Sequence, residues 1–424
     1  MEFTDLILLI GTNPLPNYVV AKHFLENNPS LQRIWLVHSE ETRYQAGTGF
    51  QAKNLEKVLE EQYKATKKGL FPLRKVALSA VSNAQLICRD INDKLISQLS
   101  PGALVHLNYT GGTKVMGIHV YQAIKQEAGK RHSGTYSYLD GRHFQIVDDN
   151  GTRIAYDLLG KISIGFEALI KLHGFIRINE KSDVNFTPAI EVYRTLINER
   201  RLNEYNSKAG GYNRTLFEDK DKPGDLARQV SKLKMDELKA FKPNDAFLSI
   251  VNAMPEKYRL FNKGGQFVPP ATNNQCERAI KFLAGGWFED HVYTIFKNAL
   301  NPSYYEIDIN WEIKKEAWTT NFQLDVIILR GYQLIGVSCT TSAHKDTCKN
   351  KGFEIIHRTT QIGGDEAKAI IVTGLCSTQI NNLQEELTIE TGSTSSNILA
   401  LGKDDWKEDI LKSEINRFLE GQET

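Results

Sequence analysis

Apolar runs alternate with amphipathic stretches through the first part of the chain, and this alternation predicts a parallel α/β domain. Leu6–Ile10 is a short continuous apolar run, typical of a strand buried on both faces, and Gly11-Thr12-Asn13-Pro14 ends it. The same pattern predicts further strands at Arg33–Val37, Lys75–Ala80, Leu104–Asn108, Tyr136–Leu139 and Phe144–Val147. Helical spacing predicts helices between them at Asn17–Glu26, Lys53–Tyr63, Ala84–Leu99 and from about Thr113 onward.

A second compact pattern begins at Cys276, where Glu277–Leu300 predicts a long helix interrupted by Gly285-Gly286. We expect the rest of this pattern to supply strands at Tyr305–Trp311, Gln323–Leu329, Gln333–Cys339 and Ala369–Thr373 and helices at Lys349–Gln361 and Gln379–Leu387. Ile398–Gly402 and Ile410–Leu419 complete this second α/β layer.

The stretch between the two patterns is less regular. Ser163–His173 and Ala189–Arg201 look helical, whereas Phe217–Gly224 is charged and loop-like, and Pro269–Asn274 reads as a linker. We therefore predict an α/β protein with a Rossmann-like domain over residues 1–155, a mostly helical connector over 156–275 and a second α/β domain over 276–424.

Composition narrows the class of protein. The chain has 424 residues, enough for about three domains of ~150 residues each. Lys and Arg total 52 against 51 Asp and Glu, so any nucleic-acid partner must be held by a local basic patch. The five scattered cysteines form no C-x-x-C pair, which argues against a disulfide framework and a structural zinc site. No apolar stretch approaches the ~18 residues of a membrane helix, and the N-terminus lacks signal-peptide character, so we expect a cytoplasmic protein without a membrane partner.

Polar loops follow the predicted strands at the sheet edge where open α/β folds bind ligands. The loop Asn108-Tyr109-Thr110-Gly111-Gly112-Thr113-Lys114 opens a helix, and its glycines and free N–H groups suit an anion such as phosphate. A plain strand-to-helix turn with a capped helix is the alternative interpretation. With the loops at Gly11 and Ser39, the candidate ligand-binding residues are Gly11, Thr12, Asn13, Ser39, Thr42, Thr110, Gly111, Gly112, Thr113 and Lys114.

Two carboxylates of the second α/β pattern suit metal-dependent phosphodiester cleavage, which uses acidic side chains to hold Mg²⁺ or Mn²⁺ and usually a lysine near the phosphate. Asp325 interrupts the apolar strand Leu324–Leu329, where an unpaired carboxylate is costly. Glu289 lies on the predicted helix Gly286–His291. The alternatives are a strand-edge aspartate near solvent and an ordinary surface glutamate.

The first 150 residues resemble the CRISPR-associated Rossmann-fold sensor domains known as CARF domains. The likeness is carried by Ile10–Pro14, Val37–Thr42 and Asn108–Met116. The resemblance implies a homodimer that binds a cyclic oligoadenylate, often the ring of four adenosines, across its two-fold axis. The residues themselves support only a phosphate-bearing ligand.

The C-terminal part resembles the PD-(D/E)xK restriction-endonuclease fold, above all the nuclease domain of CARF-domain nucleases of the Card1/Can2 type. The matching stretches are Gly285–Glu289, Asn321–Val326 and Gly363-Gly364-Asp365-Glu366-Ala367. The resemblance implies a nuclease of type III CRISPR antiviral defence that is activated by a cyclic oligoadenylate and cleaves DNA, RNA or both.

The sequence departs from that pattern on the strand after Asp325, where Ser338-Cys339-Thr340 replaces the usual E-x-K. One account moves the lost groups to the next helix, where Lys351 and Glu354 share a face. Glu289, Asp325 and Glu354 would then hold Mg²⁺ or Mn²⁺, and Lys351 would steady the phosphate or the attacking water. Lys345 and Lys349 are other possible replacements for the lysine.

Three further alternatives remain open from the sequence. In the first alternative, the C-terminal site is inactive and the chain is a ligand-gated regulator that binds nucleic acid. In the second, the N-terminal domain itself degrades its ligand. Cys339 with a nearby histidine suggests a thiol nucleophile, but a buried strand cysteine is commoner. Arg33 and His38 have the spacing of a helical ribonuclease motif but lie in a predicted strand, which argues against it. We also consider a nucleic-acid path along Trp287, Trp318 and Arg358.

Overall fold

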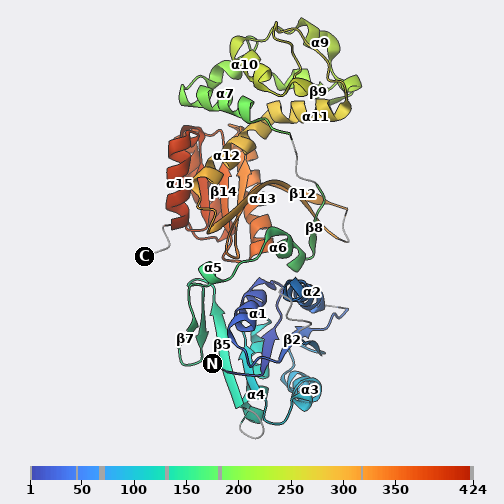
Figure 1. Ribbon diagram of the computed structural model, residues 1–424, viewed down its shortest axis with the longest axis vertical. Helices are drawn as coiled ribbons and strands as arrows, with labels where there is room; N and C mark the ends of the chain where they lie inside the picture. The colour runs from blue at the N-terminus through green and yellow to red at the C-terminus, as the bar shows by residue number, and fades with distance from the viewer. Residues whose placement is uncertain are drawn as a thin grey trace.

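Three parts are stacked along the longest axis of the molecule in the computed structural model, which describes residues 2–43, 46–65, 72–128, 133–179, 184–316 and 319–420 (Figure 1). The N-terminal domain lies at one end and a helical segment at the other. The C-terminal domain lies between them, so both of its ends are in contact with other parts of the chain.

The N-terminal domain is built from alternating strands and helices, as the hydrophobic pattern predicts. Its elements are β1 (Asp5–Leu9), α1 (Leu15–Asn27), β2 (Arg33–Ser39), α2 (Gly49–Ala65), β3 (Leu73–Leu78), α3 (Ala84–Lys94), η1 (Ile96–Gln98), β4 (Leu104–Asn108), α4 (Lys114–Ala128), β5 (Ser133–Asp140), β6 (Gln145–Asp148), β7 (Arg153–Ala155) and α5 (Leu158–Lys161). The sheet has the order β3-β2-β1-β4-β5-β6-β7. Strands β1 to β5 pair in parallel, and β6 and β7 add antiparallel at one edge.

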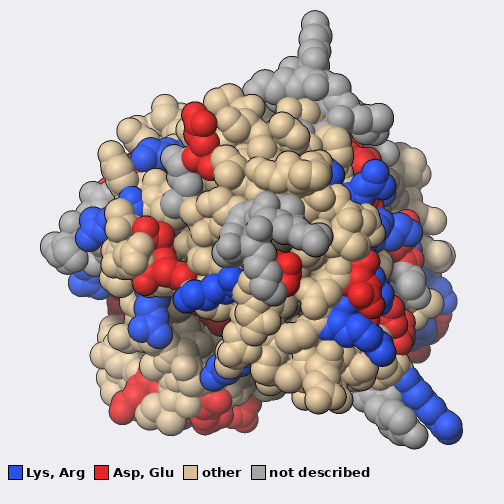
Figure 2. Space-filling view, turned by 90° about the horizontal axis from the view of Figure 1, so that it is seen from below, with Lys and Arg blue, Asp and Glu red and all other residues tan. Residues whose placement is uncertain are grey.

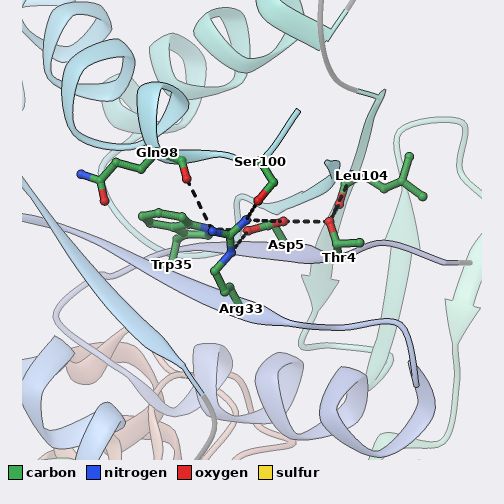
Figure 3. A network of polar contacts seen from close by, with 7 residues as sticks. All are labelled: Thr4, Asp5, Arg33, Trp35, Gln98, Ser100 and Leu104. Carbon is green, nitrogen blue, oxygen red and sulfur yellow. Dashed lines mark hydrogen bonds and ion pairs between the residues drawn. The ribbon is translucent and has the colours of Figure 1, made fainter. Parts of the chain in front are cut away.

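A buried carboxylate ties β1 to its neighbours at the end of the sheet away from the polar loops. Asp5 is fully buried, and its oxygens accept hydrogen bonds from Arg33 Nε at 2.8 Å, Trp35 Nε1 at 2.9 Å and Thr4 Oγ1 at 2.7 Å (Figure 3). A charge buried this deeply is tolerated because it is paired and hydrogen-bonded. Arg33 is therefore a structural residue of β2, which agrees with the argument against a helical ribonuclease motif.

The helical segment caps the C-terminal domain on the side away from the N-terminal domain (Figure 1). It includes a short hairpin, β9 with β10, inside the stretch that we expected to be a loop at Phe217–Gly224. Its elements are α7 (Thr187–Asn198), α8 (Leu202–Tyr205), η2 (Arg214–Phe217), β9 (Glu218–Asp219), β10 (Lys222–Leu226), η3 (Val230–Lys232), α9 (Met235–Ala240), α10 (Asp245–Ala253), η4 (Glu256–Tyr258) and α11 (Asn273–Lys281). We call this segment the helical cap, because it does not lie between the two α/β domains as a connector would.

The C-terminal domain is a six-stranded mixed sheet of order β15-β14-β13-β12-β11-β8, flanked by helices. Its elements are α6 (Phe166–Leu172), β8 (Phe175–Arg177), η5 (Phe282–Gly286), α12 (Trp287–Ala299), β11 (Tyr305–Lys315), β12 (Asn321–Arg330), β13 (Gln333–Cys339), α13 (Lys345–Gly363), β14 (Lys368–Val372), α14 (Ser377–Thr391), β15 (Ile398–Leu401), η6 (Lys403–Asp405) and α15 (Glu408–Glu420). Edge strand β8 precedes the helical cap in sequence, so this sheet draws on residues before the predicted boundary at 276.

Continuous hydrophobic packing joins the three parts. One buried cluster runs from Leu6 and Tyr18 of the N-terminal domain through Phe166 to Trp311 and Ile355 of the C-terminal domain. A second cluster joins the helical cap to the opposite face of the same sheet. A displacement in the N-terminal domain would therefore be transmitted through a packed core and not lost in a loose linker.

Charge is spread evenly on the surface that Figure 2 shows, at the end of the molecule formed by the N-terminal domain. Lys and Arg side chains lie near Asp and Glu side chains in small mixed groups, separated by uncharged residues. Within the described residues, no helix combines the length and apolar character needed to cross a membrane.

Candidate functional site: a ligand cavity and a carboxylate cluster

The glycine loop after β4 and the first turns of α4 line an open cavity of about 560 Å³. Its volume lies within the ~300–1,000 Å³ of typical small-molecule sites. The side chains and backbone that line it are Tyr109, Thr110, Gly111, Gly112, Thr113, Lys114, Gly117, Ile118, Tyr121 and Gln122. Five of the ten residues predicted to bind ligand, Thr110 to Lys114, therefore surround one space.

Hydrogen bonds hold this loop in one conformation. The buried side-chain oxygen of Asn108 accepts from Thr110 Oγ1 at 2.7 Å, and Asn108 Nδ2 donates to Ser137 Oγ at 2.9 Å. Thr113 Oγ1 accepts from the backbone N–H of Met116 and so caps the start of α4. Gly112 has φ +75°, a left-handed conformation that favours glycine. The loop is thus preorganised around the cavity.

The loop after β1 packs directly against the glycine loop. A Cβ added at Gly11 would lie 3.1 Å from the backbone nitrogen of Gly112, and one added at Gly111 would overlap the carbonyl oxygen of Leu9. These glycines allow the two loops to approach each other. Gly11, Thr12 and Asn13 lie beside the cavity loop but are not among the residues that line the cavity.

The structure does not bring the third loop to the cavity. Ser39 is buried, and its hydroxyl accepts a hydrogen bond from the backbone N–H of Thr48 at 3.0 Å, which closes the loop after β2. Thr42 lies outside the lining as well. The role of Ser39 in this structure is to hold its own loop.

Aromatic residues of the cavity were missed by the sequence analysis. Tyr109 and Tyr121 both donate a hydrogen bond from the hydroxyl group to Asp149, at 3.0 and 2.7 Å. Burial and the carboxylate of Asp149 raise the pKa of Tyr109 above its usual range. Tyr121 follows Lys114 and Gly117 at helical spacing, and this periodicity is the signal that could have identified it. The two rings give the cavity flat apolar surfaces beside its phosphate-type donors.

In the C-terminal domain, Asp325 stands in the middle of β12 and is only 7% exposed. Its Oδ2 accepts hydrogen bonds from the backbone N–H of Cys339 at 2.8 Å and from Ser338 Oγ at 3.2 Å. Across the described residues no hydrogen bond reaches Oδ1. The stretch Ser338-Cys339, which replaces the usual acidic residue, therefore positions Asp325 and leaves one of its oxygens available.

Glu289 of α12 is the second carboxylate of the cluster. Burial and the negative charges of Asp325 and Asp290 hold the pKa of Glu289 well above its usual range. Burial also raises the pKa of Asp325. The two carboxylates are thus close enough to repel each other in a poorly hydrated space.

Helix α13 places a positive charge, that of Lys351, near these two carboxylates. The ammonium of Lys351 lowers the pKa of both Glu289 and Asp325, whereas the exposed Glu354 raises that of Asp325. All four predicted catalytic residues therefore interact electrostatically, although they come from α12, β12 and α13. We call Glu289, Asp325, Lys351 and Glu354 the carboxylate cluster.

The other two candidate lysines face a different helix. Lys349 Nζ lies 2.7 Å from a carboxylate oxygen of Glu390 and 3.2 Å from one of Glu386, and Lys345 also pairs with Glu386. Both glutamates belong to α14. Lys345 and Lys349 therefore tie α13 to α14, and Lys351 is the lysine that reaches the carboxylate cluster.

Four other candidate residues either have structural roles or lie outside the described residues. Cys339 is buried, and burial with the neighbouring carboxylates raises the pKa of its thiol well above the usual range, which disfavours a nucleophilic thiolate. Trp287 is only 2% exposed, and the guanidinium of Arg358 lies 4.3 Å from the ring centre of Phe322. Trp318 lies outside the described residues.

No group of three or more His, Cys, Asp or Glu side chains within the described ranges is arranged to hold a metal ion. The predicted three-carboxylate set of Glu289, Asp325 and Glu354 therefore stays a prediction. Glu289 and Asp325 still fit a divalent cation, because they are acidic and oxygen-bearing, and they repel each other.

Comparison with known proteins agrees with the architecture. Protein VC1899 from Vibrio cholerae has a crystal structure that covers 99% of this chain and 98% of its own, with a TM-score of 0.65 and 15% identity, so the whole fold is shared. A second structure is titled a type III CRISPR defence DNA nuclease activated by cyclic oligoadenylate; it is 16% identical, covers 88% of this chain and 46% of its own, and has a TM-score of 0.46. No curated protein matches the sequence.

The family comparison concerns the N-terminal domain. Residues 6–164 match the family model of the Card1 CARF domain, from the first buried strand to the residues after α5. The match includes the glycine loop after β4, which lines the ligand cavity. It agrees with the predicted Rossmann-like domain, and residues 6–164 of the chain are thus similar to the Card1 CARF domain.

Proposed function

We propose that this protein is a metal-dependent nuclease whose activity is switched on by a cyclic oligoadenylate in type III CRISPR antiviral defence. The observation that carries the nuclease part is the carboxylate cluster, in which Glu289 and Asp325 repel each other beside Lys351. Acidic pairs with an adjacent lysine are suited to phosphodiester hydrolysis, in which the developing negative charge of the phosphate must be stabilised.

Each residue of the carboxylate cluster has a distinct part in this proposal. Glu289 and Asp325 would hold Mg²⁺ or Mn²⁺, with Glu354 at the exposed rim, and the cation would supply charge stabilisation at the scissile phosphate. The backbone N–H of Cys339 and the hydroxyl of Ser338 fix the orientation of Asp325 through Oδ2. Lys351 would orient a phosphate oxygen or the attacking water.

The sensor part of the proposal rests on the ligand cavity and on the CARF match. Free N–H groups at the start of α4 and the ammonium of Lys114 suit phosphates, and the rings of Tyr109 and Tyr121 suit stacking against adenine. Beside the cavity, α4 exposes Ile118 at 54% and Val115 at 37%. This apolar surface fits a second copy of the chain, so that one ligand bridges two sensor domains.

A short turn of the C-terminal domain connects the two sites. Gly364, just after α13, contacts the side chain of Asn13 in the loop beside the cavity. Gly141, after β5, contacts the side chain of Glu366 in the same turn. Since α13 carries Lys351, a ligand that shifts these loops would bias the position of Lys351, provided that it binds one arrangement more tightly than the other.

The test is a cleavage assay on the full-length protein with single-stranded and supercoiled nucleic acid, with and without cyclic tetra-adenylate, and with Mg²⁺, Mn²⁺ or a chelator. We expect cleavage only with ligand and metal together, and loss of cleavage in Asp325→Ala and Lys351→Ala. Glu385→Gln is the matched control, because Glu385 is an exposed carboxylate of α14 that lies outside the carboxylate cluster. Cleavage by Asp325→Ala at the wild-type rate would refute the proposed site.

A second candidate function is favoured by the hydrogen bonds of Asp325. Because Ser338 and Cys339 satisfy Oδ2 internally, Asp325 also suits a structural role in a protein that binds nucleic acid without cutting it. The same assay separates the two functions: ligand-dependent binding without cleavage supports the regulator. Consumption of the cyclic ligand without nucleic-acid cleavage would instead support degradation by the sensor domain.

A further inference from the structure

An antiparallel ribbon of three strands reaches from the ligand cavity to the C-terminal domain. It consists of β5, β6 and β7, and β5 pairs with β6 over Ser137–Asp140. Asp149 lies at the tip between β6 and β7, and Phe144 lies at the turn between β5 and β6. Rigid, paired elements of this kind carry energetic coupling between distant sites when both of their ends are packed.

The tip of the ribbon holds two walls of the ligand cavity. Oδ1 of Asp149 accepts a hydrogen bond from the hydroxyl of Tyr109 at 3.0 Å, and Oδ2 accepts one from Tyr121 at 2.7 Å. Both tyrosines line the cavity, whereas Asp149 stands behind them. Hydrogen bonds to an ionised carboxylate are roughly twice as strong as those between neutral groups. A ligand that displaces either ring must therefore pull on Asp149 or break one of these bonds.

The opposite end of the ribbon packs against the turn that joins β12 and β13. The ring of Phe144 meets that of Tyr332 edge-on, with centres 6.2 Å apart and an interplanar angle of 69°. Tyr332 is buried, so the contact lies in packed surroundings. The carbonyl oxygen of Phe144 also accepts a hydrogen bond from the backbone N–H of Leu158 at 3.0 Å, which ties the ribbon to α5.

Helix α5 lies at the junction of the two domains and extends this contact (Figure 1). The backbone N–H of Ile164, shortly after α5, donates to the carbonyl oxygen of Gly331 at 3.2 Å. A Cβ added at Gly331 would overlap the carbonyl oxygen of Leu159, and φ is +61° at this position. Because the two backbones approach so closely, neither has room to shift without moving the other.

Gly331 and Tyr332 form the turn of the hairpin that holds Asp325. Strand β12 carries Asp325, and β13 ends with Ser338 and Cys339, which donate the two hydrogen bonds to its Oδ2. The two strands pair continuously between this turn and Asp325. The ribbon thus contacts the same hairpin that sets the orientation of Asp325 in the carboxylate cluster.

We propose that Asp149 is a positioning residue that couples occupancy of the ligand cavity to the orientation of Asp325. A ligand that contacts Tyr109 or Tyr121 shifts the tip of the ribbon, and the ribbon and α5 pass this shift to the β12–β13 turn. The ligand biases the equilibrium because its contacts with the two rings differ between the two arrangements. This route reaches the strand that carries the carboxylate, whereas the turn after α13 leads to the helix that carries the lysine.

The inference rests on the proposed function, in which a cyclic oligoadenylate activates the carboxylate cluster, so its test includes a readout other than cleavage. Saturating cyclic tetra-adenylate should change the amide hydrogen exchange of positions 331–339 in the full-length wild type. Asp149→Asn replaces one acceptor oxygen by an amide nitrogen, so one tyrosine loses its partner. We expect this variant to lose most of the exchange change, and its activation of cleavage at saturating ligand to fall about tenfold.

Phe144→Ala tests the far end of the ribbon. It removes the ring that meets Tyr332, and Phe144 lies outside the cavity lining. We therefore expect the same loss of exchange change and of activation, with ligand affinity unchanged. Should Asp149→Asn bind no ligand, Phe144→Ala decides between the outcomes.

Asp93→Asn is the matched control, because Asp93 is an exposed carboxylate of α3 outside the cavity lining. Calorimetry measures whether the cavity is occupied, and thermal unfolding identifies any loss of folded protein. If ligand binds but exchange at 331–339 is unchanged in the wild type, or changes equally in the variants, the inference is overturned and the nuclease proposal stands. The expected exchange changes without any cleavage by the wild type would support the route and overturn the nuclease proposal.

Discussion

Asn13, in the loop after β1, is in direct contact with Gly364, which ends α13 in the other α/β domain. A Cβ at position 364 would overlap the side-chain nitrogen of Asn13, and Gly364 has φ +76°, where side chains are disfavoured. The contact therefore exists only because residue 364 is glycine. It lies between the loop that supports the ligand cavity and the helix that carries Lys351.

Replacing Gly364 by alanine should uncouple the two sites. We expect the activating effect of cyclic tetra-adenylate on cleavage to fall by about tenfold, within the usual range of coupling free energies, while ligand still binds to the cavity. Activity titrations and calorimetric ligand binding measure the two quantities separately. Gly392→Ala is the control, because Gly392 also has positive φ, at +66°, but a Cβ there meets nothing within 4 Å. An equal loss of activation in both variants would mean that backbone strain, not the contact with Asn13, is responsible.

Asp325→Asn should stabilise the protein in the absence of metal although it abolishes cleavage. The substitution removes one of two buried carboxylates that make each other's ionised form unfavourable, and the amide oxygen can still accept the N–H of Cys339. We expect the Tm to rise by a few degrees in chelator, and the extra stabilisation by Mg²⁺ to be lost. Scanning calorimetry with and without Mg²⁺ tests this. A lower Tm for Asp325→Asn in chelator would show that Asp325 has a structural role instead.

The ion pair of Asp5 and Arg33 should dominate the stability of the sensor sheet. Arg33→Ala leaves the fully buried carboxylate of Asp5 without its charge partner, which typically costs about 3–5 kcal/mol. The exposed pair of Lys22 and Glu26, 3.5 Å apart on α1, is the comparison, and Lys22→Ala should cost less than about 1 kcal/mol. Urea unfolding measures both costs. Similar values for the two variants would contradict the importance of burial.

The sensor domain should lose stability in acid because of His106. This imidazole is fully buried, contacts Thr135 Oγ1 at 2.8 Å and Ser137 Oγ at 2.7 Å, and burial lowers its pKa to about 3. Between pH 6.5 and pH 3 the unfolded chain binds this proton more readily, so stability falls as the pH falls, by about 1.4 kcal/mol per unit. Urea unfolding at about pH 7 and about pH 4.5 should differ by roughly 3 kcal/mol less in His106→Gln than in the wild type. An unchanged difference would exclude His106 as the cause.

The strands with continuous apolar runs were predictable in place and length. The bounds expected for β4 and β13 are the bounds observed, and apart from Leu104 every residue of the two strands is buried. The hairpin of β9 and β10 was not predictable, since its residues are half-exposed or exposed and show no alternation of apolar and polar positions. Sequence order also gives no sign that the helical cap folds back beyond the C-terminal sheet, because only β8, three residues long, marks the chain's passage through that sheet.

Some residues of the two candidate sites also stood out in the sequence, whereas others did not. Asp325 drew attention because a carboxylate inside an apolar strand is costly unless it is paired, and Lys351 because helical spacing places it on one face with Glu354; their catalytic roles stay predictions. Ser39 was misleading, since a serine after a strand looks the same whether its hydroxyl meets a ligand or Thr48.

The π-helical turn η5 determines which way the start of α12 faces. It contains one residue more than an α-helical turn, and Gly285 departs from helical dihedral angles there, so Trp287 and Phe288 enter the core while Glu289 meets Asp325. Deleting a single residue of η5 would rotate everything downstream on that helix by about 100°. Loss of one codon from η5, a segment outside the carboxylate cluster, would thus turn Glu289 away from Asp325 although every acidic and basic residue of the chain is still encoded.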